Sequence, residues 1–256
     1  MHDDNGPTRG GNLSTAIPTQ FRITSHNIDA ALRYRAVLDL LADRWRPDMR
    51  VLEVGSGSGG AAEWLRHEVI GVDTSFERTA ERGRRNLVET PGSVTAIPLP
   101  DGSFDAVLCV EMLEHIPAEE RPRAIEELVR VLAPGGRLIL TFPSGAAALA
   151  LDHWLADAYA ARHGKPHPWA TEHLALGVPD ADEMAALARA TGANVDIRSN
   201  AWGPGWRFMH DLYTVGRGLP LTWPLFHRPF VSLVYQVLAR LNGEPSYRAI
   251  VVVDRP

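Results

Sequence analysis

The sequence is poor in cysteine, in long apolar segments and in clustered basic residues, and each shortage narrows the range of functions. Its 256 residues include one cysteine, Cys109, which lies in the apolar stretch 107–110 and cannot form an internal disulfide. A single core thiol is typical of proteins from a reducing compartment, so we expect a cytoplasmic protein. No stretch approaches the roughly 18 consecutive apolar residues that a membrane-spanning helix needs.

The charge balance argues against one class of partner. The net charge is -5 at pH 7, and lysine and arginine form no extended run. Because a nucleic-acid groove needs concentrated cations to neutralise phosphates, we expect no nucleic-acid substrate. Residues 1–20 are rich in Gly, Asn, Thr and Pro without an apolar segment, which predicts a flexible N-terminal tail and no signal peptide. Residues 21–256 are expected to form one domain.

The most informative segment is VLEVGSGSGG at residues 51–60, an apolar strand with an embedded acid that runs into a glycine-rich turn. Glycines at such a corner let the backbone turn tightly and approach a nucleotide-like ligand. The segment satisfies both the dinucleotide pattern G-x-G-x-x-G, through Gly55, Gly57 and Gly60, and the pattern E-x-G-x-G-x-G, through Glu53, Gly55, Gly57 and Gly59. The loop alone therefore leaves two cofactor classes open.

Three downstream blocks decide between these classes. They are IPLPDGSFDAV at 97–107, EMLEHI at 111–116 and LVRVLAPGGRL at 128–138. Together with the glycine loop, and in this order and spacing, they resemble the class I S-adenosylmethionine (SAM)-dependent methyltransferases of the type 11 group. The resemblance covers residues 26–145 and implies SAM, not NAD, as the cofactor.

Alternating apolar and amphipathic segments predict the fold. Helices are expected at residues 28–45, 61–67, 76–87 and 118–132, and strands at 51–54, 69–73, 94–97, 104–110, 137–142, 194–198 and 247–253. This order predicts an α/β fold, a doubly wound, mostly parallel, seven-stranded Rossmann-like sheet with helical insertions after strand five and between strands six and seven. The insertions, residues 145–182 and 200–245, are expected to cover the acceptor, and segment 201–206 is predicted to be a non-helical loop.

The resemblance also assigns the cofactor contacts. Three glycines (Gly55, Gly57 and Gly59) would approach the amino-acid and ribose parts of SAM, with Glu53 near its ammonium group. Asp73, about 20 residues on, and the adjacent Thr74 would face the ribose, although a helix-capping role is the alternative for Asp73. Ser93 replaces the aspartate that relatives place against adenine, so the backbone at Thr95 and Ala96 is predicted to hold that base. Glu111 and Met112 would lie beside the cofactor, and Arg33 or Arg35 would either pair with its carboxylate or form a solvated helix face.

Methyl transfer to a hydroxyl needs alignment of the reacting atoms and a base. His115 is the first candidate, because this position faces the transfer centre in the family that the sequence resembles, and a turn-capping role is its alternative. His153, His167 and His173 are further candidates within 145–182. The histidine spacings match no closed zinc pattern, and Asp152 or Glu172 would be the candidate ligands if Mg²⁺ assists, a metal dependence that the sequence leaves undecided.

Later blocks bear on the acceptor. TFPSG at 141–145, HPWATEHL at 167–174 and Tyr247-Arg248 are similar to methyltransferases of glycan and polysaccharide assembly, such as the methylmannose polysaccharide 1-O-methyltransferases, which implies O-methylation of a saccharide or oligosaccharide hydroxyl. The predicted acceptor contacts are Trp169, Glu172, Trp202 and Trp206, because loop tryptophans present flat faces to a ligand.

Two other hypotheses stay open for the function. EMLEH at 111–115 also resembles the ubiquinone O-methyltransferases, which would make the acceptor a quinone-type or other small molecule. A non-catalytic SAM-binding regulatory protein is the hypothesis from another class. The aromatic insertion at 200–245 is interpreted as a lid, a homodimer surface or additional core.

Overall fold

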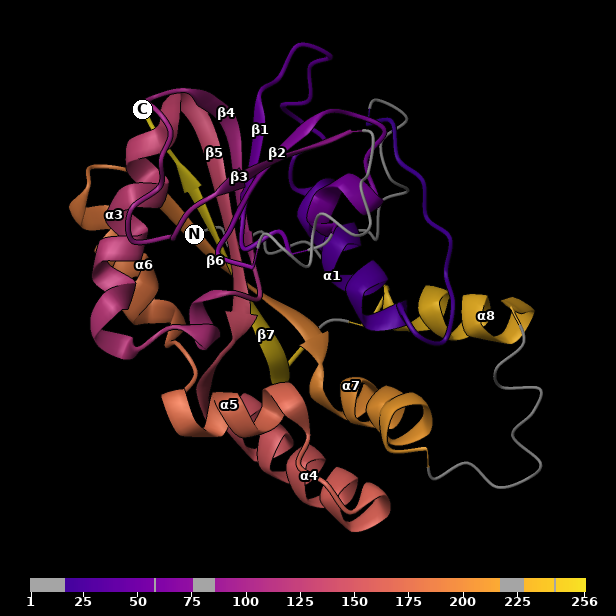
Figure 1. The fold of residues 1–256 in the computed structure, drawn as a ribbon. Helices are drawn as coiled ribbons and strands as arrows, with labels where there is room; N and C mark the ends of the chain where they lie inside the picture. Colours follow the sequence, from indigo (N-terminus) through magenta and orange to yellow (C-terminus); the bar gives the residue numbers. More distant parts are fainter. Residues whose placement is uncertain (1–16, 58, 76–85, 217–227, 242) are drawn as a thin grey trace, which may run out of the picture.

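A seven-stranded sheet organises the chain (Figure 1). The computed structural model describes residues 17–57, 59–75, 86–216, 228–241 and 243–256. In sequence order the strands are β1 (Val51–Val54), β2 (Val69–Asp73), β3 (Leu87–Pro91), β4 (Phe104–Val110), β5 (Leu132–Pro143), β6 (Asn194–Trp202) and β7 (Ser246–Asp254). Their spatial order is β3-β2-β1-β4-β5-β7-β6, and β7 runs antiparallel to both of its neighbours. The predicted doubly wound, mostly parallel Rossmann-like sheet is confirmed.

Helices cover both faces of the sheet. They are α1 (Ile28–Asp39), α3 (Arg121–Val131), α4 (Gly145–His163), α5 (Pro168–Leu176), α6 (Ala181–Ala190), α7 (Gly203–His210) and α8 (Arg228–Leu238). Short helical turns are η1 (Gly60–Glu63), η2 (Leu113–His115), η3 (Ala118–Glu120) and the π-helical η4 (Asp211–Val215). In Figure 1, α3 and α6 lie on one side of the sheet, α1 and α8 on the other, and α4, α5 and α7 gather beyond the ends of β5 and β7.

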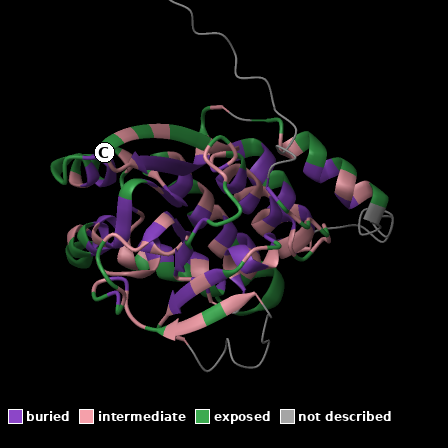
Figure 2. Cartoon of the chain, turned by 90° about the horizontal axis from the view of Figure 1, so that it is seen from above, coloured by how far each residue is buried: buried purple, intermediate pink, exposed green. Residues whose placement is uncertain are grey.

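The alternation of side chains along each strand builds two hydrophobic cores. Val51 and Leu108 face the core that α1 and α8 cover, whereas Leu52 and Val107 face the core under α3 and α6. Successive residues of a strand point to opposite faces, so a strand buried on both sides must be apolar throughout. This explains the apolar run of β4, where Cys109 is buried as expected. Figure 2 shows the buried residues concentrated between the outer, exposed helix faces.

Three predicted elements differ from the structure. The third strand is Leu87–Pro91 and not 94–97, because Val94 and Ile97 turn into the core under α3 instead of extending the sheet edge. The predicted helix 76–87 lies mostly outside the described residues, and its last residue, Leu87, belongs to β3.

The other two differences concern helix ends. The first helix ends at Asp39 and not at residue 45, since the chain turns there and Arg44 donates to the carbonyl of Gly135. The predicted helix 61–67 shortens to η1, because the chain leaves the helical path to pair Leu65 with Thr19.

The N-terminal boundary also moves. Ile17 is buried in the core, Thr19 pairs with Leu65, and the amide of Gln20 donates to the carbonyl of Trp64 at 2.8 Å. The expected tail over 1–20 therefore includes residues 17–20 that pack on the domain, and residues 1–16 lie outside the described part. Ile17, a hydrophobic residue within a polar segment, was the sequence signal that this part of the chain packs on the domain.

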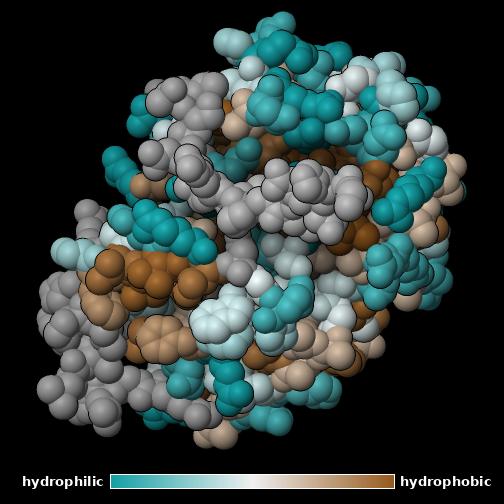
Figure 3. Space-filling model, turned by 180° about the vertical axis from the view of Figure 1, so that it is seen from behind, coloured by the Kyte–Doolittle hydropathy of each residue, from teal (hydrophilic) through white to brown (hydrophobic). Residues whose placement is uncertain are grey.

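The insertion 200–245 contains core as well as surface. Segment 201–206 is not a loop, because α7 begins at Gly203 and Pro204 occupies its first turn, a position that proline favours. Trp206 is buried and stacks on Tyr247 with ring centroids 3.9 Å apart. On α8, Leu233 and Val237 are exposed, and Figure 3 shows an apolar strip over this helix. Within the described residues, every helix is too short or too polar to span a bilayer.

The packing of Ile17 yields a stability test. Ile17→Ala should lower the free energy of unfolding by about 2–4 kcal/mol, because a buried side chain of this size leaves a cavity when truncated. The control is Val88→Ala on the edge strand, where the side chain is 45% exposed. Urea unfolding of both variants measures the difference, and equal stabilities would show that residues 17–20 do not belong to the folded domain.

Candidate active site

The glycine loop connects β1 to η1 at the carboxyl end of the sheet. Gly55, Gly57 and Gly60 adopt positive φ angles of +79°, +51° and +47°, which glycine tolerates best. A Cβ on Gly55 would lie 2.4 Å from Cγ of Met112, whereas no atom of the described residues lies within 4 Å of the corresponding point on Gly57. Gly59 has extended backbone, so Gly60 and not Gly59 is the third position that needs glycine. The open space at Gly57 fits the close backbone approach that SAM requires.

Glu53 anchors this loop from within the core. Its carboxylate is fully buried and accepts hydrogen bonds from the Tyr34 hydroxyl at 2.6 Å and from the Ala61 amide at 2.5 Å. Burial raises the pKa of Glu53 to about 7 even though both hydrogen bonds oppose that rise. Both oxygens are thus engaged with protein groups, and the predicted position of Glu53 near the cofactor's ammonium group stays a prediction.

Asp73 at the end of β2 also binds the loop. One carboxylate oxygen accepts from the Gly57 amide at 2.8 Å and the other from the Ser75 amide at 2.6 Å. The local bond to Ser75 matches the capping alternative, and the bond to Gly57 places the acid at the loop where ribose would lie. Thr74 is exposed next to it.

The predicted adenine side lies beyond β3. The hydroxyls of Ser93 and Thr95 are 2.9 Å apart, and Ser93 forms an isolated bridge with the exposed Ala96. The amide of Gly92 donates to the carbonyl of Asp73 at 3.2 Å, which joins this turn to the end of β2. The turn is therefore positioned at the same edge of the sheet as the glycine loop.

A partly buried ionic network starts where β4 ends. Glu111 has a positive φ of +51°, which is uncommon for a residue with a side chain. Its carboxylate accepts from Nε of Arg248 at 2.8 Å, and Arg248 also contacts Asp29 at 3.3 Å. Arg33 lies 3.6 Å from Asp29 and 3.8 Å from Glu111, whereas Arg35 pairs with Asp39. Burial alone would raise the pKa of Asp29, but the nearby guanidinium groups of Arg248 and Arg33 lower it to about 2.

A cavity of about 300 Å³ opens between α1, η2, α5, α7 and β7. Its lining includes Asp29, Arg33, Glu111, Glu114, His115, Trp169, His173, Trp206, His210 and Tyr247. Trp169 faces His173 with ring centroids 5.2 Å apart and His210 at 5.8 Å, so aromatic and imidazole rings form much of its wall. Because Glu111 ends the strand beside the glycine loop, the cavity adjoins the cofactor region.

Several predicted residues lie elsewhere. His153 is exposed on α4, because it follows the inward-facing Asp152 and points about 100° away from it around the helix. His167 is buried and accepts from the Ala170 amide as the N-cap of α5, and burial lowers its pKa to about 4. Trp202 lines a separate cavity of about 700 Å³ between α1, β6 and α8.

Two carboxylate–histidine pairs meet in the cavity wall. Nδ1 of His173 lies 3.0 Å from Oδ2 of the fully buried Asp152, whose other oxygen accepts from the Tyr247 hydroxyl at 2.8 Å. Nδ1 of His115 lies 3.1 Å from Oε2 of Glu172. Asp152 is therefore a partner of His173 and Tyr247, so its carboxylate is not free for the Mg²⁺ role considered above.

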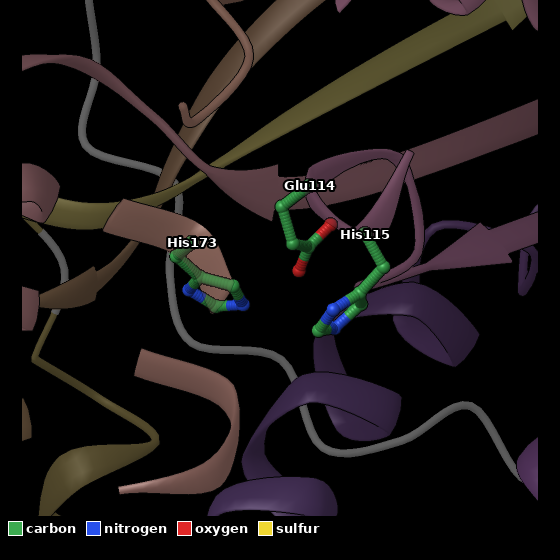
Figure 4. Close-up of side chains that lie close together, drawn as sticks. All are labelled: Glu114, His115 and His173. Carbon is green, nitrogen blue, oxygen red and sulfur yellow. The ribbon is translucent and has the colours of Figure 1, made fainter. Parts of the chain in front are cut away.

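Glu114 lies between these two pairs. Figure 4 shows its carboxylate and the rings of His115 and His173 pointing toward one another. Glu114 is fully buried, and neither of its oxygens has a hydrogen-bond partner among the described residues. Burial and the neighbouring charge of Glu111 raise the pKa of Glu114 well above its usual value.

Sequence reasoning assigned no role to Glu114, His210 or the ion-pairing Arg248. Glu114 precedes a predicted catalytic residue, and a charged residue inside an apolar block was the signal that could have found it. Arg248 contacts Glu111 across 137 positions of sequence, a pairing that no local pattern reveals.

Known proteins resemble this chain in sequence and in fold. A family model described as a methyltransferase domain matches residues 52–140. A demethylmenaquinone methyltransferase of Deinococcus radiodurans is 28% identical over 211 residues, covering 74% of this chain and 85% of that protein. An uncharacterized methyltransferase of Mycobacterium sp. (strain JLS) is 32% identical, covering 70% and 80%. A SAM-dependent methyltransferase structure from Thermotoga maritima, a possible histamine N-methyltransferase by its description, superposes with a TM-score of 0.57 at 16% identity over 91% and 92% of the two chains.

The chain belongs to the class I SAM-dependent methyltransferases. SAM is therefore its cofactor, and the glycine loop is the part of the structure that fits it. The resemblance drawn from the four sequence blocks is confirmed at this level.

The buried acid under the loop predicts a pH dependence of stability. Folding raises the pKa of Glu53 from about 4.5 to about 7, so the folded protein holds a proton that the unfolded chain releases. This contribution is complete below pH 4.5, is lost as pH rises to 7, and amounts to at most about 3 kcal/mol. Urea unfolding from pH 5 to 8 should show a fall in wild-type stability relative to Glu53→Gln, which cannot titrate. A pH-independent difference between the two proteins would contradict the assignment.

Proposed function

We propose that this methyltransferase transfers the methyl group of SAM to a hydroxyl-bearing aromatic ring, of the quinol type, bound in the 300 Å³ cavity. The observation that carries the proposal is the cavity itself, which adjoins Glu111 and is walled by Trp169, Tyr247 and imidazole rings. Aromatic side chains favour planar ligands through stacked and edge-to-face contacts.

The size of the cavity supports a small acceptor. Ligand sites for drug-sized molecules span roughly 300–1,000 Å³, and this cavity lies at the lower end of that range. One or two fused rings match such a volume better than an oligosaccharide does. The predicted sugar-stacking role also loses one of its tryptophans, because Trp202 lines the other cavity.

The chemistry requires loss of the hydroxyl proton. A phenolate carries electron density on its oxygen and on the adjacent ring carbons, so its ionisation activates either atom. The attacking atom donates an electron pair to the methyl carbon, the carbon–sulfur pair returns to sulfur, and the products are methylated ring, S-adenosylhomocysteine and one proton. The Glu114, His115 and His173 cluster lies in the cavity wall, where that proton would be removed.

The relatives support the quinone-type hypothesis over the saccharide one. Demethylmenaquinone methyltransferases of Deinococcus radiodurans and other bacteria resemble this chain, and one quinone relative is described as a C-methyltransferase. The acceptor atom, oxygen or carbon, is therefore part of the test. A saccharide acceptor and a non-catalytic SAM-binding role are the rival outcomes.

Cofactor binding has its own measurement. S-adenosylhomocysteine at 100 times its dissociation constant should raise the melting temperature by about 5–10 °C, because it binds only the folded chain. NAD at the same concentration should leave the melting temperature unchanged. The reverse pattern would remove the cofactor assignment.

Acceptor choice is tested with SAM carrying a deuterated methyl group. Hydroquinones, naphthohydroquinones, simple phenols, monosaccharides and oligosaccharides should be incubated separately, with mass spectrometry and NMR locating the new methyl group on oxygen or carbon. We expect labelling of ring compounds only. His115→Ala should lower turnover roughly 100-fold or more while S-adenosylhomocysteine affinity stays near wild type.

The matched control is His163→Ala, since His163 contacts the Val215 carbonyl away from the cavity. Labelled saccharides with unlabelled rings would refute the proposed acceptor. Absence of any labelled product, with normal cofactor binding, would favour the regulatory protein.

A further inference from the structure

We infer that Glu114, His115 and His173 bind one divalent transition-metal ion whose open coordination positions face the cavity. Each side chain offers one ligand atom, and these atoms lie within 4.8 Å of one another. Two of the ligands come from η2 and the third from α5, so the site joins the end of β4 to the first insertion (Figure 4).

Unpartnered polar atoms are the first observation behind this site. Both carboxylate oxygens of Glu114 and Nε2 of His173 are buried without a hydrogen-bond partner among the described residues. Leaving a buried polar group unsatisfied typically costs about 1–3 kcal/mol, and more for a charged one. Three such atoms in one place mark a site where an ion supplies the missing interaction.

The histidines are oriented as metal ligands are. Asp152 holds Nδ1 of His173, and Glu172 holds Nδ1 of His115, which leaves Nε2 of each ring to coordinate. Metal-binding histidines almost always donate their other ring N–H to a carboxylate, carbonyl or water in this way. The Tyr247 hydroxyl in turn donates to Asp152 and fixes the second layer of the site.

The donor set selects the class of ion. Two imidazoles and one carboxylate suit Zn²⁺, Co²⁺, Mn²⁺ or Fe²⁺, whereas Mg²⁺ prefers oxygen ligands in a strict octahedron. Ligand atoms at about 2.0–2.2 Å from a tetrahedral ion lie about 3.4 Å apart, so atoms that are up to 4.8 Å apart must close by up to about 1.4 Å. His115, with 32% of its side chain exposed, has room to make that movement.

The function of the ion rests on the proposed methyl transfer. An acceptor hydroxyl bound at an open position would lose its proton more readily, because a divalent cation stabilises the oxyanion. The proton leaves to solvent, and the oxygen or the adjacent ring carbon then takes the methyl group. Binding of the ion itself does not depend on which acceptor is used.

The test uses the full chain treated with EDTA, dialysed and titrated with Co²⁺, whose visible absorption reports its coordination. We expect one Co²⁺ per chain, displaced by Zn²⁺. His173→Ala and Glu114→Gln should weaken binding at least 10-fold, and Asp152→Asn, which changes only the orienting carboxylate, should weaken it about 10- to 100-fold. His163→Ala is the matched control and should bind Co²⁺ as wild type does.

A thermal shift with S-adenosylhomocysteine verifies that each variant is folded. No Co²⁺ or Zn²⁺ binding by the wild type, or binding that survives both ligand substitutions, would overturn the site. A chain that binds Co²⁺ as expected but methylates no ring compound would contradict the proposed function alone. Full turnover by the EDTA-treated protein, unaltered by added Zn²⁺ or Co²⁺, would overturn the ion's role in the reaction.

Discussion

The buried guanidinium of Arg248 is the interaction that joins the cofactor side of this site to the acceptor side. It contacts Glu111 at the end of β4, Asp29 on α1 and the side-chain oxygen of Asn200 on β6. A charge in the core is tolerated only when its partners satisfy it, so these contacts depend strongly on one another. The antiparallel insertion of β7 between β5 and β6 brings Arg248 to that position, because its register places Arg248 opposite Pro143 at the end of β5.

The adjacent residue extends the same organisation to the cavity. The Tyr247 hydroxyl donates a hydrogen bond to Asp152, and Asp152 holds the imidazole of His173. The start of β7 therefore determines how this imidazole of α5 is oriented. The stack of Trp206 on Tyr247 then attaches α7 to this arrangement. Two consecutive residues of one strand thus position groups from six other elements, which explains why the two insertions can pack as part of the domain.

The sequence predicted which segments meet around the glycine loop because the signals for them are local. The glycine loop, Asp73 and the block at 111–116 each lie within a few residues of a strand end, and a parallel sheet brings those ends together. The third strand was misplaced because an edge strand with exposed side chains lacks the apolar pattern of a central one. The start of α7 at Gly203 was missed because glycine and proline were interpreted as loop residues, although proline suits a first helical turn.

The acceptor side could not be predicted in the same way, because its contacts join distant parts of the chain. Asp152 and Tyr247 are 95 positions apart, and the bond between Arg248 and Glu111 spans 137. A histidine in a sequence shows neither which carboxylate will hold it nor which ring nitrogen will face a cavity. His153 and His173 were equivalent candidates in the sequence, yet one is exposed on α4 and the other is oriented by Asp152.

The local motifs around the glycine loop and the long-range contacts around the cavity lie largely in different parts of the chain. A structure sharing only 16% identity superposes over 91% of this chain, so the fold tolerates extensive substitution. The cavity, by contrast, takes much of its wall from α1, α5, α7 and β7, which lie outside the matched family segment of 52–140. Changes in those elements would alter the cavity without disturbing the glycine loop. Under the proposed function, acceptor choice therefore depends on the long-range contacts of the insertions, and cofactor binding depends on the local motifs of the sheet.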